Sequence, residues 1–318
     1  MDEVHLVTGG AGFIGSHLVE ALLRDGHRVR VFDDFSTGLK ANLEGLPGQP
    51  ELVEGSLTDP DAVAEAVRGA AVVYHLGALA SVARSVETPL VSHAACATGT
   101  LHVLDAARRM GVRRVVYAAS SSAYGGVSSD EGQTEDLLPA ALSPYAAAKL
   151  AGEYYLQAFT ATYGLETVRL RFFNIFGPRQ RADSPYSGVI AIFTALLSAG
   201  KPPCVHGDGL QSRDFTYVAN AVQALRKAAT APAERVSGRV YNVGTGRSVT
   251  VLELVSALNQ LLGQHLSPIH GPARPGDVRY SRADIRRTRA DLGYEPAVSF
   301  EDGLKATLRW YLDLNRGS

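Results

Sequence analysis

Tyr145 and Lys149 lie four residues apart in an alanine-rich stretch, and their types suit proton-transfer chemistry. The surrounding pattern predicts one long helix over 143–163, in which residues at i and i+4 share a face. The Lys149 ammonium can therefore lie near the Tyr145 phenol. Because a nearby cation favours the phenolate, we expect a lowered pKa that lets Tyr145 act as a base near neutral pH. A solvated helix face is the alternative explanation of this spacing.

Three consecutive serines give the tyrosine–lysine pair more weight. Ser120, Ser121 and Ser122 come directly after a predicted strand that ends at Ala119. Hydroxyl groups at this point can hold a substrate hydroxyl and stabilise an alkoxide as it forms. A polar loop without a catalytic role is the alternative.

A glycine-rich turn near the start of the chain has the spacing of a dinucleotide site. Gly9, Gly12 and Gly15 follow a predicted strand over 4–8 and open a predicted helix over 13–24. Glycines in this context let the backbone approach a pyrophosphate, which then lies at the helix N-terminus. A glycine turn without a ligand is the alternative.

An acidic residue, Asp33, ends the next predicted strand, over 28–33. A carboxylate at this position accepts hydrogen bonds from the adenosine ribose and repels a 2′-phosphate, which favours NAD over NADP. A turn aspartate that contacts no ligand is the alternative.

The elements that must position these residues alternate between strand and helix. Predicted strands lie at 4–8, 28–33, 71–76, 114–119 and 166–172, and predicted helices lie at 13–24, 61–68, 101–110 and 143–163. This alternation predicts an α/β fold with a doubly wound parallel Rossmann sheet, and such sheets bind ligands beyond the carboxyl ends of their strands. The motifs above fall at those ends.

After Asn174, prolines and glycines divide the chain into shorter segments. A strand is predicted at 240–243 and helices at 251–262 and 300–314. We therefore predict two domains. The first is an NAD-binding Rossmann domain over 1–174 with returning segments near 214–246, and the second is a smaller, discontinuous α/β substrate-binding domain over 175–318.

Composition narrows the possible partners and location. The 318 residues carry a formal net charge of −1, which gives no indication of a nucleic-acid partner. The two cysteines, Cys96 and Cys204, predict neither a disulfide framework nor a metal site. No signal peptide and no apolar run of about 20 residues is evident, so we expect no membrane span and a cytoplasmic protein.

Ordered motifs extend along nearly the whole chain. They are TGGAGFIG at 8–15, FDDFSTG at 32–38, HLGALASVARSVETP at 75–89, SSSAYG at 120–125, SPYAAAK at 143–149, RFFNIFGPRQ at 171–180, SPYSGVI at 184–190, GDGLQSRDFTYV at 207–218, YNVGTG at 241–246 and RPGD at 274–277. Together they resemble the extended short-chain dehydrogenase/reductase family, and within it the UDP-hexose 4-epimerases, especially those that act on UDP-N-acetylglucosamine. The resemblance implies that NAD is the cofactor and a UDP-sugar the substrate.

The same resemblance implies a role for each matching residue. Tyr145 would be the base, Lys149 its electrostatic partner, and Ser120 the catalytic serine that precedes the Tyr124–Gly125 pair by four residues. The implied NAD contacts are Gly9, Gly12, Phe13, Ile14, Gly15, Asp33, Asp34, Ser36, Thr37, Gly38, Ser56, Leu57, Leu76, Gly77, Ala78, Tyr145 and Lys149. The implied substrate contacts are Ser121, Ser122, Asn174, Arg213, Arg274, Asp277 and Ser281. The planar fork of an arginine matches phosphate oxygens, although a surface ion pair is the alternative for Arg213.

Two positions indicate the class of reaction and substrate. Ser122 stands where related dehydratases and decarboxylases carry a glutamate, so we expect neither of those reactions. Ser281 stands where similar epimerases that exclude N-acetyl sugars carry a bulky tyrosine. We therefore expect reversible C4 epimerisation of UDP-GlcNAc and UDP-GalNAc, together with UDP-glucose and UDP-galactose, through a transient 4-keto sugar. One pocket residue typically shifts such discrimination by about 1–3 kcal/mol.

The chain also departs from the family pattern. Ser56 replaces an aspartate near the adenine, Cys96 replaces an asparagine on the nicotinamide side, and Asn220 stands where an aspartate is usual. We interpret Cys96 as a buried packing residue because it lies in an apolar helical stretch.

Other functions stay open. A UDP-uronate 4-epimerase would need cations near C6 of the sugar, and Arg84 and Arg181 are candidates. A net nucleotide-sugar oxidoreductase and a non-catalytic NAD-sensing protein are further alternatives, since a fold alone does not prove chemistry.

The resemblance also implies a homodimer held by a four-helix bundle, with two helices from each subunit, near 90–110 and 143–163. Alanines in both segments would permit close approach of the helices. Packing of these alanines within one subunit is the alternative.

Overall fold

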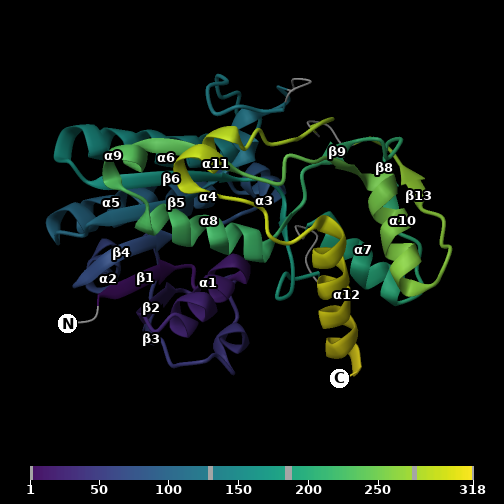
Figure 1. Ribbon diagram of the computed structural model, residues 1–318, viewed down its shortest axis with the longest axis horizontal. Coiled ribbons are helices and arrows are strands. Elements are labelled where there is room, and N and C mark those ends of the chain that lie inside the picture. Colours follow the sequence, from purple (N-terminus) through teal and green to yellow (C-terminus); the bar gives the residue numbers. More distant parts are fainter. Residues whose placement is uncertain (1–2, 128–131, 183–187, 274–277, 317–318) are drawn as a thin grey trace.

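The computed structural model describes residues 3–127, 132–182, 188–273 and 278–316. A seven-stranded sheet with the order β11-β6-β5-β4-β1-β2-β3 forms its centre, and every neighbouring pair is parallel (Figure 1). The strands are β1 (Val4–Thr8), β2 (Arg28–Asp33), β3 (Glu51–Glu54), β4 (Ala70–His75), β5 (Arg114–Ser120), β6 (Glu166–Phe172) and β11 (Arg239–Val243). The predicted doubly wound α/β Rossmann fold is confirmed.

Helices cover both faces of the sheet because successive side chains of each strand point to opposite faces. On one face, α1 (Phe13–Arg24), α8 (Val218–Thr230) and α11 (Arg286–Leu292) pack with Val7 and Tyr74. On the other, α2 (Pro60–Val67), α5 (Gly99–Arg109) and α6 (Pro144–Tyr163) pack with Leu6 and Val73. Both faces of the parallel sheet are therefore buried, as the apolar strands require.

The long helix α6 begins at Pro144, one residue after the predicted start. The side chain of its N-cap, Ser143, accepts a hydrogen bond from the backbone N–H of Ala146, and Pro144 occupies the first helical turn. Gly164 ends the helix in the left-handed conformation, which glycine adopts without steric cost. This frame holds Tyr145 and Lys149 in the first two turns.

A second hydrophobic cluster lies to one side of the sheet and contains three helices, α7 (Val189–Ser198), α10 (Val251–Leu262) and α12 (Phe300–Arg316) (Figure 1). Two strand pairs accompany them. They are β8 (Cys204–His206) with β13 (Ile269–Gly271), and β9 (Ser212–Arg213) with β12 (Val249–Thr250). The short strands β7 (Ile175–Phe176) and β10 (Thr216–Tyr217) pair where the chain leaves the sheet. The predicted division into domains at residue 174 stays a prediction.

Between β4 and α5 the chain forms a run of short helices: α3 (Val82–Glu87), α4 (Pro89–His93) and one π-helical turn, η2 (Ala94–Thr98). The remaining short helices are η1 (Lys40–Leu43), η3 (Ser121–Tyr124) and α9 (Ala233–Val236). Both α3 and α4 pack against α6.

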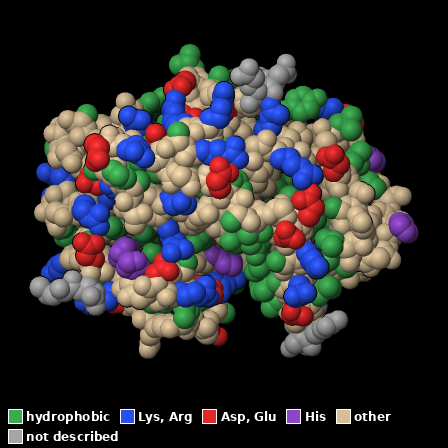
Figure 2. All heavy atoms as spheres, viewed as in Figure 1, with side chains coloured by type: hydrophobic (Ala, Val, Ile, Leu, Met, Phe, Trp, Pro, Cys, Tyr) green, Lys and Arg blue, Asp and Glu red, His purple; other side chains and the backbone are tan. Residues whose placement is uncertain are grey.

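The surface carries both signs of charge. On the face shown in Figure 2, Lys and Arg side chains lie among Asp and Glu side chains. Ion pairs at the surface of the protein include Arg279 with Asp208 and Arg287 with Asp136. Within the described part of the chain, no helix is both long enough and apolar enough to cross a bilayer.

Candidate functional site

The glycine turn between β1 and α1 is so tight that side chains larger than hydrogen would collide with backbone. A Cβ on Gly15 would lie 2.1 Å from the Gly9 carbonyl oxygen, and a Cβ on Gly9 would lie 2.8 Å from the backbone of Gly77. Gly9 also has a φ of 67°, in the left-handed region that favours glycine. The N-cap of α1 is Gly12, which has no side chain to cap the helix. The turn thus presents bare backbone and a helix N-terminus, which fit a dinucleotide pyrophosphate.

Asp33 shapes this turn through its side chain. One carboxylate oxygen accepts from the backbone N–H of Ala11 at 2.9 Å, and the other accepts from that of Phe35 at 2.9 Å. Burial raises the pKa of Asp33, and these two hydrogen bonds oppose the shift. Asp33 therefore stabilises the turn, which was the alternative explanation for an acidic residue at this position. Its predicted contact with the ribose stays a prediction.

The predicted contacts that follow Asp33 lie in an adjoining loop. Gly38 packs so closely on Asp33 that a Cβ would lie 2.9 Å from its carboxylate, and Asp34 accepts from the backbone and hydroxyl of Ser36. Thr37 is exposed. Phe13 and Ile14 form the start of α1, where both are partly buried.

The contacts predicted after β3 and β4 meet beside the glycine turn. The Leu57 side chain packs so closely against Gly77 that a Cβ there would lie 2.8 Å away, and the Gly77 N–H donates to the Thr8 hydroxyl at 3.1 Å. The Leu76 N–H donates to the Thr8 carbonyl. The Ser56 hydroxyl bonds to Thr58 at 2.9 Å. Thr8 therefore ties the end of β4 to the start of the glycine turn.

Ser120 and Tyr145 come together at the carboxyl end of β5. The Ser120 hydroxyl lies close enough to the phenol to lower the pKa of Tyr145, and η3, which follows Ser120, packs against α6. The Ser120 hydroxyl also accepts from the Ser122 backbone at 3.2 Å and from the Ser122 hydroxyl at 2.8 Å. Ser121 begins the one-turn helix η3. The tyrosine and the serine that were predicted from separate motifs thus form one cluster.

Lys149 occupies a buried position behind this cluster. Its ammonium donates a 2.9 Å hydrogen bond to the Ala118 carbonyl and lies over the Tyr117 ring. Burial lowers the pKa of Lys149, and the nearby Cys96 and Glu153 side chains oppose that shift. The lysine is therefore held by the sheet rather than by the phenol.

The expectation of a lowered pKa for Tyr145 is wrong for this structure. Burial raises the pKa of Tyr145, the nearby Cys96 side chain acts in the same direction, and the Ser120 hydroxyl opposes both. Helical spacing placed the two residues on one face, but the ammonium reaches a strand carbonyl that local spacing does not reveal.

Cys96 is a fully buried packing residue, as predicted. It lies in the π-helical turn and forms a small apolar cluster with Ala97 and Ala148, against which Ala78 and Tyr145 also pack. Its place beside Tyr145 makes it part of the wall of the site.

The predicted substrate residues come from several segments. Arg213 donates to the carbonyl of Ser212, and the same carbonyl accepts from the backbone of Ser281 at 3.2 Å, so the segment of Ser281 lies beside β9, which carries Arg213. Asn174 has a φ of 37°, a left-handed conformation that is uncommon outside glycine. Arg274 and Asp277 lie outside the described residues.

A model of the NAD dependent epimerase/dehydratase family matches residues 5–244. The chain belongs to this family. NAD is accordingly its cofactor, and the bare glycine turn described above fits that molecule.

Similar proteins in the epimerase/dehydratase family carry out more than one reaction. The UDP-glucose 4-epimerase of Mycolicibacterium smegmatis is 38% identical over 309 residues, which are 96% of this chain and 97% of that protein. The UDP-N-acetyl-alpha-D-glucosaminuronate decarboxylase of Bacillus cytotoxicus is 33% identical over 319 residues, or 97% and 98% of the two chains. The structure of a UDP-N-acetylglucosamine 4-epimerase from Methanobrevibacter ruminantium, in complex with UDP-N-acetylmuramic acid, superposes with a TM-score of 0.92 and 35% identity over 98% and 99% of the chains.

Sequence reasoning missed one acidic residue of this epimerase/dehydratase family member. Asp214 is fully buried, and its carboxylate accepts from the backbone N–H groups of Thr245, Gly246 and Ala283 at 2.8 to 3.1 Å. It thereby joins the strand of Arg213 to the segment that follows Ser281. The adjacent Arg213–Asp214 sequence suggested a surface ion pair instead, and only the tertiary structure reveals the buried backbone donors.

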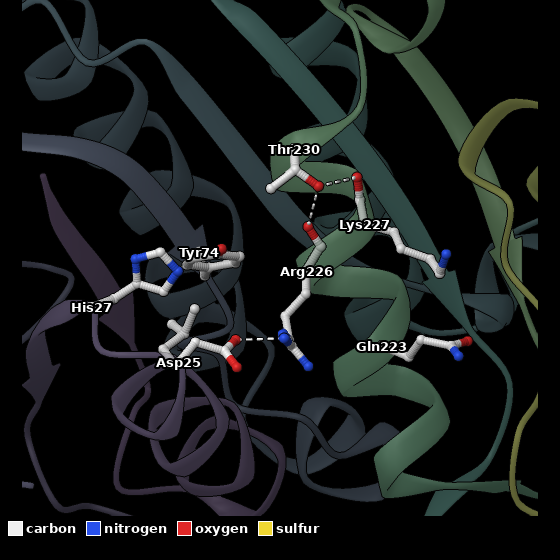
Figure 3. A pocket seen from close by; sticks show the side chains of 8 residues that line it. Asp25, His27, Tyr74, Gln223, Arg226, Lys227 and Thr230 are labelled. Carbon is white, nitrogen blue, oxygen red and sulfur yellow. Dashed lines mark hydrogen bonds and ion pairs between the residues drawn. The ribbon is translucent and has the colours of Figure 1, made fainter.

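A pocket of about 280 Å³ lies between α1 and α8 (Figure 3). Leu22 and Tyr74 form part of its lining, and an ion pair between Asp25 and Arg226 closes one side. Because Asp25 precedes β2, this pocket is at the amino ends of the strands, opposite the end that carries Ser120. None of the predicted site residues lines it.

Proposed function

We propose that this protein catalyses reversible epimerisation at C4 of a UDP-hexose. The observation that carries the proposal is that η3, which follows Ser120, packs against α6, so that Ser120, Tyr145 and the buried Lys149 ammonium lie near the carboxyl end of β5. A hydroxyl base, a second hydroxyl and a fixed cation are the groups needed to remove a proton from an alcohol and stabilise the resulting charge.

In the proposed reaction, Tyr145 removes the proton from the C4 hydroxyl of the sugar, and the Ser120 hydroxyl donates a hydrogen bond to the developing alkoxide. Bound NAD supplies the reversible hydride acceptor for C4. Lys149 stabilises the tyrosine when it is deprotonated. The planar 4-keto sugar rotates to present its other face while its UDP group stays bound. Return of the hydride to that face of C4 and of the proton from Tyr145 to the C4 oxygen then gives the C4 epimer.

The residues assigned to NAD follow the glycine turn and the loops after β2, β3 and β4. Gly9, Gly12 and Gly15 would lie against the pyrophosphate, and Asp33 would accept from the adenosine ribose. Leu57 and Gly77 would flank the same groove. The hydrogen bonds of Asp33 to Ala11 and Phe35 use one lone pair on each oxygen, so further acceptor capacity remains for a ribose hydroxyl.

UDP is the nucleotide group that we assign to the substrate. Support comes from the UDP-sugar relatives and from the arrangement of Arg213 beside Ser281. Asn174, Arg274 and Asp277 are proposed to hold the diphosphate and the uridine ribose.

The sugar specificity rests on two serines. The Ser122 hydroxyl donates a hydrogen bond to the Ser120 hydroxyl. Because Ser122 has no carboxyl group that could remove a C5 proton, dehydration and decarboxylation are disfavoured. Ser281 is small and lies beside Ser212, which leaves room at C2 of the sugar. We therefore propose that N-acetylhexosamines are accepted together with plain hexoses.

A homodimer is the proposed assembly. Leu90 of α4 is 83% exposed and Tyr154 of α6 is 59% exposed, and α4 packs against α6 within the subunit. Apolar side chains exposed on two packed helices support burial against a second copy through a four-helix bundle.

The decisive experiment is a turnover assay without added cofactor, with UDP-GlcNAc and UDP-glucose tested in parallel by NMR. Conversion of both sugars is expected. Conversion of UDP-glucose alone would support the 4-epimerase activity and contradict the proposal for Ser281. Absence of both 4-epimers would reject the proposed function and direct the next assays to UDP-uronates and to net oxidation with added NAD.

A non-catalytic NAD sensor is tested by Tyr145→Phe. This change removes the hydroxyl that serves as the base and leaves the ring in place. An enzyme loses turnover after this substitution, whereas a sensor keeps its function.

A further inference from the structure

A buried ion pair connects the helix of Tyr145 with the strand beside Ser120. The side chains of Arg171 in β6 and Glu153 in α6 are 4% and 3% exposed, so both charges lie in the core. Three contacts of 2.8 to 3.2 Å join the guanidinium to both carboxylate oxygens. A paired geometry of this kind sets the separation and the orientation of the two elements.

Along α6 and β6, the two residues of the ion pair lie close to the elements that carry Tyr145 and Ser120. Glu153 lies one helical turn beyond Lys149 and two turns beyond Tyr145, so all three share one side of α6. Arg171 is in register with Ala119 of β5, and the next pair in the same register is Ser120 with Phe172. The ion pair therefore joins the helix that holds the base to β6, the strand paired with the one that ends in the serine.

The same arginine also contacts the turn that follows Ser120. Its guanidinium lies 4.7 Å from the centre of the Tyr124 ring, and Tyr124 is the last residue of η3. The Tyr124 hydroxyl donates to Asn242 at 2.6 Å, and the Asn242 amide donates to the carbonyls of Gln133 and Asp284. One continuous set of contacts thus links α6, β6, η3 and β11.

Stability alone is a weak explanation of this pair. Removal of two charges from water costs free energy that their attraction only partly returns, and apolar replacements of a buried pair are often neutral. A defined geometry is the effect that apolar side chains would not reproduce.

We propose that Glu153 and Arg171 are positioning residues that hold the Tyr145 hydroxyl in register with the Ser120 hydroxyl. This inference rests on the proposed function of that cluster. Neither residue is assigned a contact with substrate or cofactor. A displacement of about 1 Å between reacting groups can reduce turnover about 100-fold, so loss of the pair is expected to act on kcat.

The test compares two double variants. Glu153→Met with Arg171→Met removes the ion pair and keeps similar side-chain volume. The control, Arg114→Met with Glu166→Met, removes an ion pair that joins β5 and β6 at their amino ends. For each protein we would measure kcat, KM and the melting temperature, together with amide hydrogen exchange over 120–125 and 144–150.

The expected result is a roughly 10- to 100-fold fall in kcat for the Glu153/Arg171 variant, with KM within about threefold of wild type. Exchange over 120–125 should quicken in this variant and not in the control. A kcat within about twofold of wild type in the folded variant would overturn the proposal. So would an equal fall in kcat in the control, because the effect would then follow general stability.

Two further results keep the test decisive. If the double variant does not fold, Arg171→Lys replaces it, since this change keeps the charge and loses the paired geometry. Its kcat must then fall at least about threefold at an unchanged melting temperature, and an unchanged kcat would reject the inference. If the wild type converts no UDP-hexose, the proposed function fails, and hydrogen exchange alone decides the positioning role: faster exchange over 120–125 supports it, and unchanged exchange overturns it.

Discussion

The Lys149 ammonium lies 4.7 Å from the centre of the Tyr117 ring. The ring face carries partial negative charge and attracts a cation, and the carbonyl of Ala118 accepts a hydrogen bond from the same ammonium. Both partners belong to β5, the strand that ends in Ser120. The sheet therefore holds a buried cation one helical turn beyond Tyr145 on α6.

Lys149→Met is expected to reduce kcat by at least about 100-fold, because the cation that stabilises deprotonated Tyr145 is lost. The fold should persist, since removal of a buried charge also removes its desolvation cost. Steady-state kinetics and circular dichroism check both statements. Lys227→Met, at the other end of the sheet, is the control, and a kcat within tenfold of wild type for Lys149→Met would contradict the assigned role.

Gly15→Ala is expected to abolish retention of NAD. The added Cβ would lie 2.1 Å from the Gly9 carbonyl oxygen, so the turn must open to accommodate it. Bound NAD released by denaturation of the purified protein is the measurement. Gly48→Ala is a matched control, because its Cβ would meet only the Leu23 side chain at 3.4 Å. Full NAD occupancy in Gly15→Ala would show that this turn does not hold the cofactor.

Ser281→Tyr is expected to discriminate against N-acetyl sugars. The larger side chain would occupy the space that we assign to the C2 substituent, and one pocket residue typically changes discrimination by about 1–3 kcal/mol. The ratio of kcat/KM for UDP-GlcNAc to that for UDP-glucose should therefore fall about 10- to 200-fold. The activity on UDP-glucose serves as the internal control. An unchanged ratio would place the C2 substituent elsewhere.

Leu90→Asp is expected to convert a dimer into a monomer. The side chain is 83% exposed in the subunit, and a carboxylate buried at an apolar helical interface would be unpaired. Light scattering measures the mass directly. Leu138→Asp is the control, because Leu138 is 86% exposed but lies outside α4 and α6. A monomeric wild type would contradict the four-helix bundle.

Much of the sheet follows from local sequence. The predicted bounds of β1, β2, β6, α1 and α10 agree with the structure, because apolar strands and capped helices leave local signals. The return of β11 to the edge of the sheet, and the placement of α8 beside α1, depend on contacts between distant segments. The two-residue strands β7 and β10 are too short to leave a pattern.

The candidate site was partly predictable for the same reason. Glycine spacing and the 145–149 pair are local, and the structure brings Tyr145 and Ser120 together as a cluster. The buried ion pair was not predicted, because Arg171 lies within an apolar strand and Glu153 within an alanine-rich helix. Only their juxtaposition across the core reveals them as partners.

His75 leads to a prediction about stability and pH. Its ring is fully buried between the hydroxyls of Thr8 and Thr100, at 2.7 and 3.0 Å. Burial lowers the pKa of His75 to about 3, and the charge of Lys149 acts in the same direction. In the unfolded chain the ring takes up a proton near its usual pKa of about 6.5. Because the His75 ring stays unprotonated in the folded protein, it lowers the free energy of unfolding as the pH falls from about 6.5 towards 3.

His75→Gln keeps a side chain that can bond to both threonines but does not titrate. At pH 7.5 the variant is expected to be less stable than wild type, because the ring packing against Tyr117 is lost. Between pH 7.5 and pH 5 the difference in the free energy of unfolding should narrow by about 2 kcal/mol, since only the wild type loses stability through this group. Urea unfolding at the two pH values measures the change. His5, which titrates in both proteins, cancels in the comparison, and an equal difference at both pH values would show that His75 does not control the acid sensitivity of the fold.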